Sequence, residues 1–221
     1  MLKSNKIIII SDSGKDVGLG HYSRSKYLSE ELKTFFKKKI QIKNILLQKK
    51  IFLKDKNFIN VSIEKNFYVK IFKFIEIFKP THIIFNVSKK FENKYIELLL
   101  KKIKSKHSYI NLIAIDGCIK FKSYFKKIWI PNVYLKRKNR YKNIYYGWDK
   151  ILFKKIEKNK KKNKKKILIL LGGTDAYNFS KKLPQILNKF FDHKFSISWL
   201  QGPFAPKPKL KKFNNWKVLK D

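Results

Sequence analysis

Short apolar runs rich in β-branched residues alternate along the chain with longer stretches of helical periodicity. This alternation constrains the fold more than any other feature. Continuous apolar runs are typical of buried strands, and apolar side chains three and four positions apart are typical of helices. Because strands that alternate with helices favour a parallel sheet with right-handed crossovers, the sequence predicts the α/β class.

The same patterns place the individual elements of the first part of the chain. We expect strands at KIIIIS (6–11), IQIKNILLQ (40–48), THIIFNV (81–87) and INLIAID (110–116), with further short strands at KIWIPN (127–132) and NIYYG (143–147). A helix follows the first strand, with an apolar face formed by Leu28, Leu32, Phe35 and Phe36. Two more helices start at Phe67 and Glu92, and the former ends at Pro80 because proline cannot continue the hydrogen-bond ladder.

The composition changes at KKIEKNKKKNKKK (154–166), a charged run typical of an exposed linker. The alternation then restarts with the strand and turn ILILLGGTD, the helix NFSKKLPQILNKFF interrupted early by Pro184, and strands at KFSISWLQG and WKVL. We therefore predict an N-terminal domain at 1–153, a lysine-rich linker at 154–166 and a second α/β domain at 167–221. Doubly wound domains usually need roughly a hundred residues, so we expect the chain to stop partway through the second one.

The net charge of +39 suggests a polyanionic partner. Only three of the 54 basic residues are arginine, however, and arginine is the residue favoured for bidentate recognition of phosphates and bases. Lys, Ile, Asn, Phe and Tyr are abundant together, as an AT-rich coding sequence would give. We therefore favour compositional drift and expect no nucleic-acid partner, while loose attraction to anionic membrane surfaces stays open.

Cys118 is the single cysteine, so neither an internal disulfide nor a cysteine-based metal cluster is expected. No stretch reaches the ~18 apolar residues that span a bilayer. The four isoleucines near the N-terminus are too short for a signal sequence. We expect a soluble cytoplasmic protein, and the sequence leaves the oligomeric state open.

A glycine-rich turn joins the first predicted strand to its helix, in the segment SDSGKDVGLGHYSR (11–24). Backbone N–H groups in such a turn can approach an anion, and a helix N-terminus adds positive potential. The segment lacks the third glycine of the dinucleotide fingerprint and the Gly-Lys-Ser/Thr ending of a P-loop. Gly18 and Gly20 therefore form either an anion-binding turn or simply a tight connection.

His21 ends this turn at the carboxyl end of the first strand, where open α/β sheets bind ligands. An imidazole can act as a general base near neutral pH, and Asp12 at the exit of the strand could orient it or hold a water. The structural alternative is that Asp12 caps the turn and His21 donates a hydrogen bond to a loop carbonyl.

A second glycine turn, Gly172-Gly173-Thr174-Asp175, again lies between an apolar strand and a helix. In the structural interpretation, Thr174 or Asp175 caps the helix through a side-chain oxygen. In the functional interpretation the turn binds an anion. Two such turns, one per α/β unit, would line a nucleotide-sugar cleft.

The two motifs DSGKDVGLGHYSRSKYLSEEL and ILLGGTDAYNFSKKL, in this order and spacing, resemble the UDP-sugar hydrolases of pseudaminic acid biosynthesis. Those enzymes act on UDP-2,4-diacetamido-2,4,6-trideoxy-β-L-altropyranose and are similar in fold to GT-B glycosyltransferases, including spore-coat polysaccharide glycosyltransferase-like proteins. The positions that match are Asp12, Gly18, Gly20, His21, Arg24 and Gly172 to Asp175, with weaker similarities at IAID (113–116), IPN (130–132) and GWDKILF (147–153).

The resemblance implies a GT-B-like fold, with a Rossmann-like N-terminal domain and an incomplete second domain. It implies that His21, assisted by Asp12, activates water to cleave the sugar–UDP linkage. It further implies that the UDP-sugar is bound without metal or cofactor by Gly18, Gly20, Arg24, Gly172, Gly173, Thr174 and Asp175.

The sequence also departs from the family pattern. Ile10 replaces an arginine, FNVSKK replaces an acidic segment, and Asp116-Gly117 replaces paired aspartates. The chain ends at Asp221, before the family's further glycine-rich loop and glutamate, and a chain that ends there would have impaired activity. The alternatives are a GT-B glycosyltransferase for surface polysaccharide and a non-catalytic basic binding module or remnant.

Overall fold

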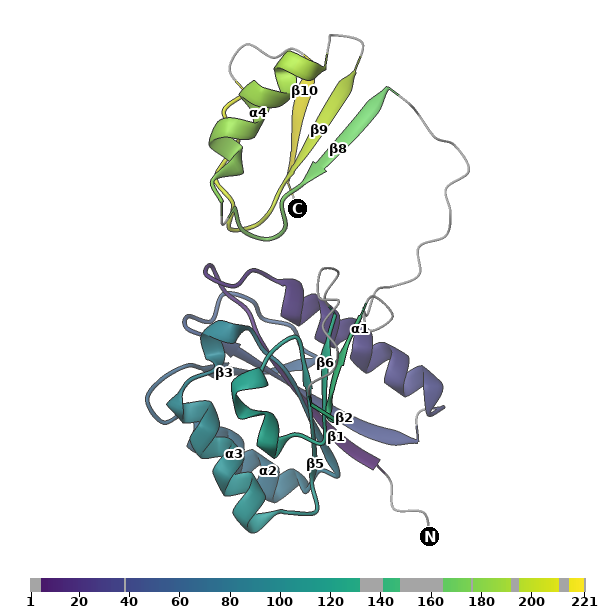
Figure 1. The fold of residues 1–221 in the computed structure, drawn as a ribbon, viewed down its shortest axis with the longest axis vertical. Coiled ribbons are helices and arrows are strands. Elements are labelled where there is room, and N and C mark those ends of the chain that lie inside the picture. The colour runs from purple at the N-terminus through teal and green to yellow at the C-terminus, as the bar shows by residue number, and fades with distance from the viewer. Residues whose placement is uncertain are drawn as a thin grey trace. The chain divides into compact units, whose positions relative to one another are not determined.

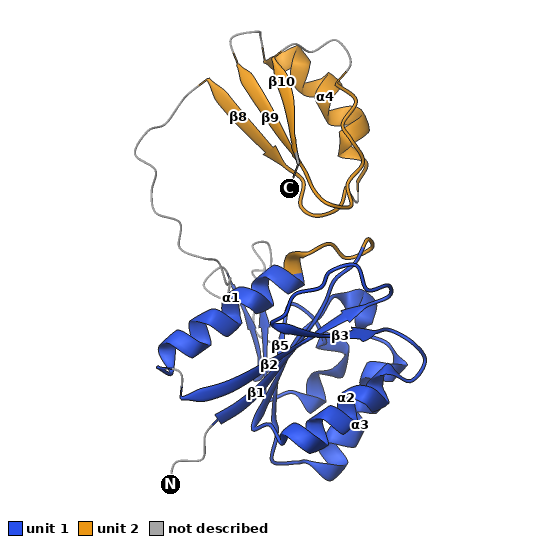
Figure 2. Cartoon of the chain, turned by 180° about the vertical axis from the view of Figure 1, so that it is seen from behind, with its two compact units in different colours: residues 1–14, 21–154 blue, residues 15–20, 155–221 orange. Residues whose placement is uncertain are grey.

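The structure is a computed structural model that describes residues 5–37, 39–131, 141–147, 165–175, 177–191, 195–210 and 215–220. The chain forms two compact units, residues 1–14 with 21–154 and residues 15–20 with 155–221 (Figure 2). Most of the predicted linker, residues 154–164, lies outside the described residues, as do Asn132 and residues 148–153 of the weaker family similarities. The domain boundaries stay a prediction.

The first unit is built on a sheet with helices on both sides (Figure 1). The sheet is parallel, and its described strands lie in the order β3-β2-β1-β4-β5-β6-β7. Its elements are β1 Asn5–Asp12, α1 Gly20–Phe35, β2 Ile40–Gln48, β3 Phe58–Ser62, α2 Phe67–Phe78, β4 His82–Asn86, η1 Lys89–Phe91, α3 Lys94–Lys106, β5 Asn111–Ile115, η2 Ile119–Tyr124, β6 Lys127–Ile130 and β7 Ile144–Tyr146. The predicted α/β class with a parallel sheet is confirmed.

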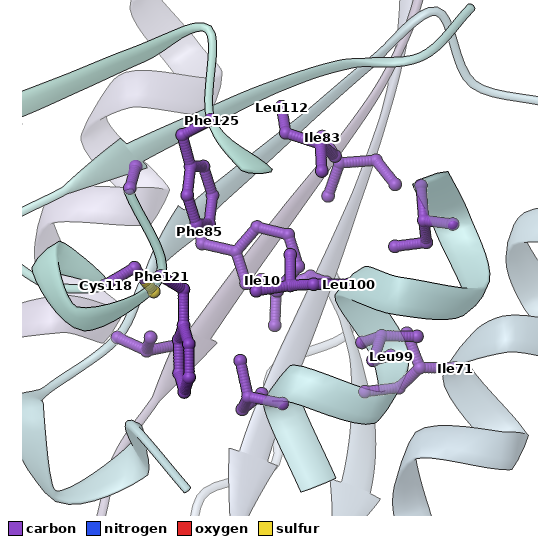
Figure 3. Packing of buried hydrophobic residues seen from close by; sticks show 14 of the residues in the cluster. Ile10, Ile71, Ile83, Phe85, Leu99, Leu100, Leu112, Cys118, Phe121 and Phe125 are labelled. Carbon is purple, nitrogen blue, oxygen red and sulfur yellow. The ribbon is translucent and has the colours of Figure 1, made fainter. Parts of the chain in front are cut away.

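Both faces of this sheet are buried, which explains why its strands are continuous apolar runs. Alternate residues of β1 point to opposite faces: Ile8 and Ile10 pack with α2, α3 and η2, whereas Ile7 and Ile9 pack with α1. Figure 3 shows the larger cluster, in which side chains of the strands meet those of the helices. Because the strands are parallel, their carboxyl ends lie together at one edge of this buried sheet.

Two details of the first unit differ from the predictions. Strand β3 was not expected, because FINVS is short and follows a polar loop, yet it extends the sheet beside β2. Phe35, predicted on the apolar face of α1, is 79% exposed, so this prediction was wrong. The helix ends at Phe35, and the chain beyond it turns so that Phe36 packs against the sheet instead.

The second unit has a parallel sheet of strands β10-β9-β8 and one described helix, α4. Its elements are β8 Lys166–Leu170, α4 Phe179–Phe190, β9 Ser196–Gln201 and β10 Trp216–Lys220. Ile197, Trp199 and Trp216 form a small core that packs with residues of α4. On β8, Leu168 and Leu170 are more than half exposed, so the described part of this unit covers one face of its sheet.

Pro184 does not interrupt α4, contrary to the prediction. The helix continues through Pro184, which is buried. Because proline has no N–H, it cannot bond to the carbonyl of Ser180 one turn earlier. The backbone N–H of Lys209 donates to that carbonyl at 3.1 Å instead, so no carbonyl is left unsatisfied by the proline.

Candidate active site

The order of the strands defines where a ligand would bind in the first unit. From β1 the chain proceeds to β2 and β3 on one side, and from β4 to β5, β6 and β7 on the other. Open α/β sheets bind ligands at the carboxyl ends of the two strands where the order reverses. Here those strands are β1, which ends at Asp12, and β4, which ends at Asn86. The point where the strand order reverses is the switch point of the sheet. We use the name switch-point cluster for the polar residues at this point, which are Asp12, His21, Arg24, Asn86 and Ser88.

Asp12 is fully buried and holds the segment that follows β4. Its carboxylate accepts hydrogen bonds from the backbone N–H of Ser88, at 3.1 and 3.2 Å, and from the Ser88 hydroxyl at 2.6 Å. Burial raises the pKa of Asp12 above its ordinary value, and the charge of His21 and the bonds from Ser88 offset part of that rise. Asp12 therefore joins the ends of β1 and β4 and interacts with His21 through charge.

His21 lies in the first turn of α1, with its Nδ1 at 3.0 Å from Oδ1 of Asn86. The imidazole thus contacts a side chain from the neighbouring strand end rather than the loop carbonyl of the structural alternative. Asn86 also accepts from Nη1 of Arg24 at 3.1 Å. The amide of Asn86 therefore joins two of the residues predicted from the glycine motif, and the sequence analysis had not selected Asn86.

Arg24 connects the switch-point cluster to the end of β5. Its Nη2 lies 3.0 Å from Oδ2 of Asp116, and the two side chains are 21% and 37% exposed. Because the pair is only partly buried, the guanidinium keeps access to solvent while its position is fixed from two sides. Such a held cation can receive a negatively charged ligand without reorganising.

A tight turn places Asp116. Both Asp116 (φ +65°) and Cys118 (φ +62°) adopt the left-handed conformation, which is unusual for residues other than glycine. Between them, a Cβ on Gly117 would lie 2.3 Å from the carbonyl oxygen of Val87. The backbone N–H of Cys118 donates to Glu92 Oε1 at 2.8 Å, which stabilises the turn. Unfavourable backbone conformations of this kind persist where the surroundings hold them, often at functional sites.

The two glycines of the first motif have different structural requirements. Gly18 has φ +74°, which favours glycine, whereas Gly20 begins α1 and a Cβ there would meet nothing within 4 Å. Gly18 is therefore explained by the backbone of a tight turn. Neither the backbone nor packing requires Gly20 to be glycine, so its assignment to substrate binding stays a prediction.

In the second unit, the glycine turn packs closely against a third glycine. Gly172 has φ +82°, and a Cβ on Gly202 would lie 2.1 Å from the carbonyl oxygen of Gly172. The backbone N–H of Phe204 donates to the carbonyl of Gly173 at 3.0 Å. The loop after β9 thus supports the turn after β8, a role of Gly202 that the sequence analysis missed.

Asp175 caps α4, as the structural interpretation of the second motif predicted. Oδ1 accepts from the backbone N–H of Phe179 at 2.7 Å, and Oδ2 from that of Ser180 at 2.8 Å. Burial pushes the pKa of Asp175 up, but the hydrogen bonds from Ser180 and Phe179 outweigh it, so the pKa lies below its ordinary value. The chain's own carboxylate therefore binds N–H groups at the start of α4 that an anionic ligand would otherwise use.

Sequence reasoning did not select Asn86, Ser88, Asp116 or Glu92 as site residues, although Asp116 lies in the weaker family similarity IAID (113–116). FNVSKK was noticed only because it lacks acidic residues. One signal was present: Asn86 is a polar residue near the carboxyl end of an apolar strand, and the carboxyl ends of parallel strands meet at one edge. Within the described ranges, no group of three or more His, Cys, Asp or Glu side chains could hold a metal ion. None of the described helices is long and apolar enough to cross a membrane.

Neither a protein-family profile nor a curated protein matches the sequence. Among solved structures, the UDP-GlcNAc 2-epimerase from Methanocaldococcus jannaschii matches 97% of this chain and 73% of its own, with a TM-score of 0.51 and 14% identity. An α-glucosyltransferase matches 64% of this chain in two structures, one with UDP and mismatched DNA and one with UDP, at TM-scores of 0.42 and 0.40 and 14% identity. The chain spans 40% and 43% of those two chains.

At this identity the likeness to the epimerase shows the fold alone. With the two parallel sheets described above, it establishes an α/β protein with a GT-B-like fold, as the sequence predicted.

Proposed function

We propose that this protein is a nucleotide-sugar hydrolase, which cleaves a UDP-linked diacetamido-trideoxy sugar to UDP and the free sugar in pseudaminic acid biosynthesis. The observation that carries the proposal is the switch-point cluster. It places a histidine, held by the end of β4, beside a buried aspartate at the end of β1. A positioned imidazole can act as a general base near neutral pH.

In the proposed reaction, His21 removes a proton from water. The water oxygen forms a bond to the anomeric carbon, the bond from that carbon to the UDP oxygen breaks, and UDP leaves with its electron pair. The imidazole becomes a cation in this step. Asp12 interacts with His21 through charge, and this interaction offsets part of the rise that burial causes in the pKa of Asp12.

We assign Arg24 to substrate binding, because its partly exposed guanidinium is held by Asn86 and Asp116. Gly18, Gly20, Gly172, Gly173 and Thr174 keep their assigned role in substrate binding through the backbone of the two turns. Asp175 keeps its assigned role as well, because each oxygen of its carboxylate accepts one hydrogen bond at α4 and retains a further lone pair.

The test is UDP release from the altropyranose substrate, measured with wild type and the variant His21→Ala. His82→Ala is a matched control. His82 lies at the opposite end of β4, where its ring bonds to Thr81 and Asn111, so it shares the residue type but not the site.

We expect UDP and free sugar from wild type without any acceptor, at least a hundredfold less from His21→Ala, and activity retained in His82→Ala. Equal activity of wild type and His21→Ala would refute the role of His21. Turnover that requires an added acceptor would replace the hydrolase by a glycosyltransferase. No turnover of this substrate by the wild type would refute the proposed function.

A further inference from the structure

Asn86 has an unusually complete set of hydrogen bonds for a side chain at a candidate active site. It is fully buried at the end of β4. Its Nδ2 donates to the backbone carbonyl of His21 and to Oγ of Ser25, both at 2.8 Å. Its Oδ1 is 3.0 Å from His21 Nδ1 and 3.1 Å from Arg24 Nη1. An amide has two N–H donors and two acceptor lone pairs, so all four positions are used.

These bonds fix which way the amide faces. A backbone carbonyl can only accept a hydrogen bond, so the atom of Asn86 that faces the His21 carbonyl has to be the nitrogen. Oδ1 is then the atom that faces the imidazole. Since Oδ1 can only accept, Nδ1 of His21 has to carry the hydrogen that lies between them.

A neutral imidazole carries one hydrogen, so a hydrogen on Nδ1 leaves the lone pair on Nε2. The same amide also holds Arg24 through Nη1, while Asp116 holds Nη2. One neutral side chain thus determines which nitrogen of His21 can accept a proton, and it also contacts the guanidinium of Arg24.

We propose that Asn86 is a positioning residue that fixes the Nδ1–H tautomer of His21 and thereby makes Nε2 the basic atom of the site. The inference deepens the proposed function, and rests on it for the identity of the reaction. The geometry it uses comes from the first unit alone.

The neutrality of Asn86 matters because of the charges around it. Arg24 on α1 donates to the amide, Asp116 after β5 pairs with Arg24, and Asp12 on β1 interacts with His21 through charge. A carboxylate in place of the amide would still accept from Nδ1. However, it would add a negative charge about 3 Å from the ring and so favour the doubly protonated form of His21, which has to lose a proton before it can act as a base.

The tautomer can be read by NMR without any substrate. The chain has four histidines, so selectively ¹⁵N-labelled protein gives few signals, and those of His21 are identified by their loss in His21→Gln. In wild type above the titration of His21 we expect the hydrogen on Nδ1 and an unprotonated Nε2. A wild-type ring with its hydrogen on Nε2 would overturn the inference.

Two variants of Asn86 test whether this residue determines the tautomer of His21. Asn86→Asp should move the His21 titration to higher pH by about one to three units, because an opposite charge is added within a few ångströms. Asn86→Leu removes the acceptor with little change in volume and should give a mixture of both tautomers. The control is Asn44→Leu, which deletes another buried amide, on β2, bonded to Ser29 and Asn57, and should leave the His21 signals unchanged.

Asn86 variants whose His21 tautomer and titration match those of wild type would refute the inference even if the protein cleaves UDP-sugars. A correct tautomer in a protein that cleaves no UDP-sugar supports the positioning role and refutes only the proposed reaction. In the active enzyme, Asn86→Asp should move the acid limb of the pH–rate profile upward by the same one to three units and lower kcat more than it changes KM. A purely structural role would leave that limb in place.

Discussion

Replacing Gly117 by alanine tests the link between the strained turn after β5 and the switch-point cluster. The new Cβ would lie 2.3 Å from the carbonyl oxygen of Val87, whereas ordinary contact begins at 3.4 Å. The two atoms must therefore separate by about 1.1 Å more. Val87 lies between Asn86 and Ser88, so its displacement moves the partner of His21 and the partner of Asp12 together.

The magnitude follows from the two effects. Overpacking against backbone atoms costs about 1–3 kcal/mol, and weakening the bonds from Ser88 to a buried carboxylate adds about 1 kcal/mol. We expect Gly117→Ala to lower the free energy of unfolding of the first unit by about 2–4 kcal/mol. A displacement of about 1 Å at catalytic groups should also reduce kcat/KM about a hundredfold.

The assay is urea unfolding followed by circular dichroism, with hydrogen exchange of the backbone N–H of Ser88 as a local probe. The matched control is Gly20→Ala, where a Cβ meets nothing within 4 Å, and its stability should change by less than about 0.5 kcal/mol. Equal stability and equal exchange at Ser88 in Gly117→Ala and wild type would show that the turn yields freely and would refute the reasoning.

Three further results are expected. Asn93→Ala should destabilise the protein by about 1 kcal/mol, because Asn93 accepts from two backbone N–H groups at the start of α3; urea unfolding against wild type measures it, and no change would contradict the capping role. Asp175→Ala should cost about 1 kcal/mol at neutral pH. The pKa of Asp175 is lower in the folded than in the unfolded protein, so its contribution to the free energy of unfolding is present above the unfolded pKa and is lost as the pH falls through the folded pKa. The stabilities of variant and wild type should therefore converge as the pH falls below about 4. Cys118 should resist alkylation until the protein unfolds, because burial and then the charges of Glu92 and Asp12 raise the pKa of its thiol; rapid labelling of the native protein at pH 8 would contradict this.

Much of the fold could be predicted because most of the buried strands are continuous apolar runs in the sequence. The second strand was predicted with the same bounds that the structure gives to β2, Ile40–Gln48. The helix from Phe67 ends before Pro80, as expected. Strand β3 was missed because pairing with β2, rather than its own short pattern, makes FINVS a strand. The helix continues through Pro184, contrary to the sequence-based prediction, because the N–H that replaces the one proline lacks comes from Lys209, a residue distant in the sequence.

The sequence predicted the residues that β1 and α1 contribute to the candidate site, but not those at the end of β4. Asp12 and His21 lie in one continuous segment, so their motif could be read directly. Their partners Ser88 and Asn86 lie 76 and 65 residues away in sequence, and nothing in FNVSKK identifies either as a ligand of that motif. For the second motif the sequence offered two roles for Asp175, namely capping the helix and binding substrate. The structure shows the capping bonds, because both carboxylate oxygens accept hydrogen bonds from N–H groups of α4.

The sequence by itself determined the α/β class, the positions of most strands and helices, and the two glycine turns, because periodicity and turn chemistry act over a few neighbouring residues. Only the tertiary structure decided what surrounds His21. The pairing of β1 with β4 brings Asn86 and Ser88 to the end of the strand that carries Asp12. The orientation of one buried amide then determines which nitrogen of the imidazole carries its hydrogen, since each hydrogen bond there needs a donor and an acceptor.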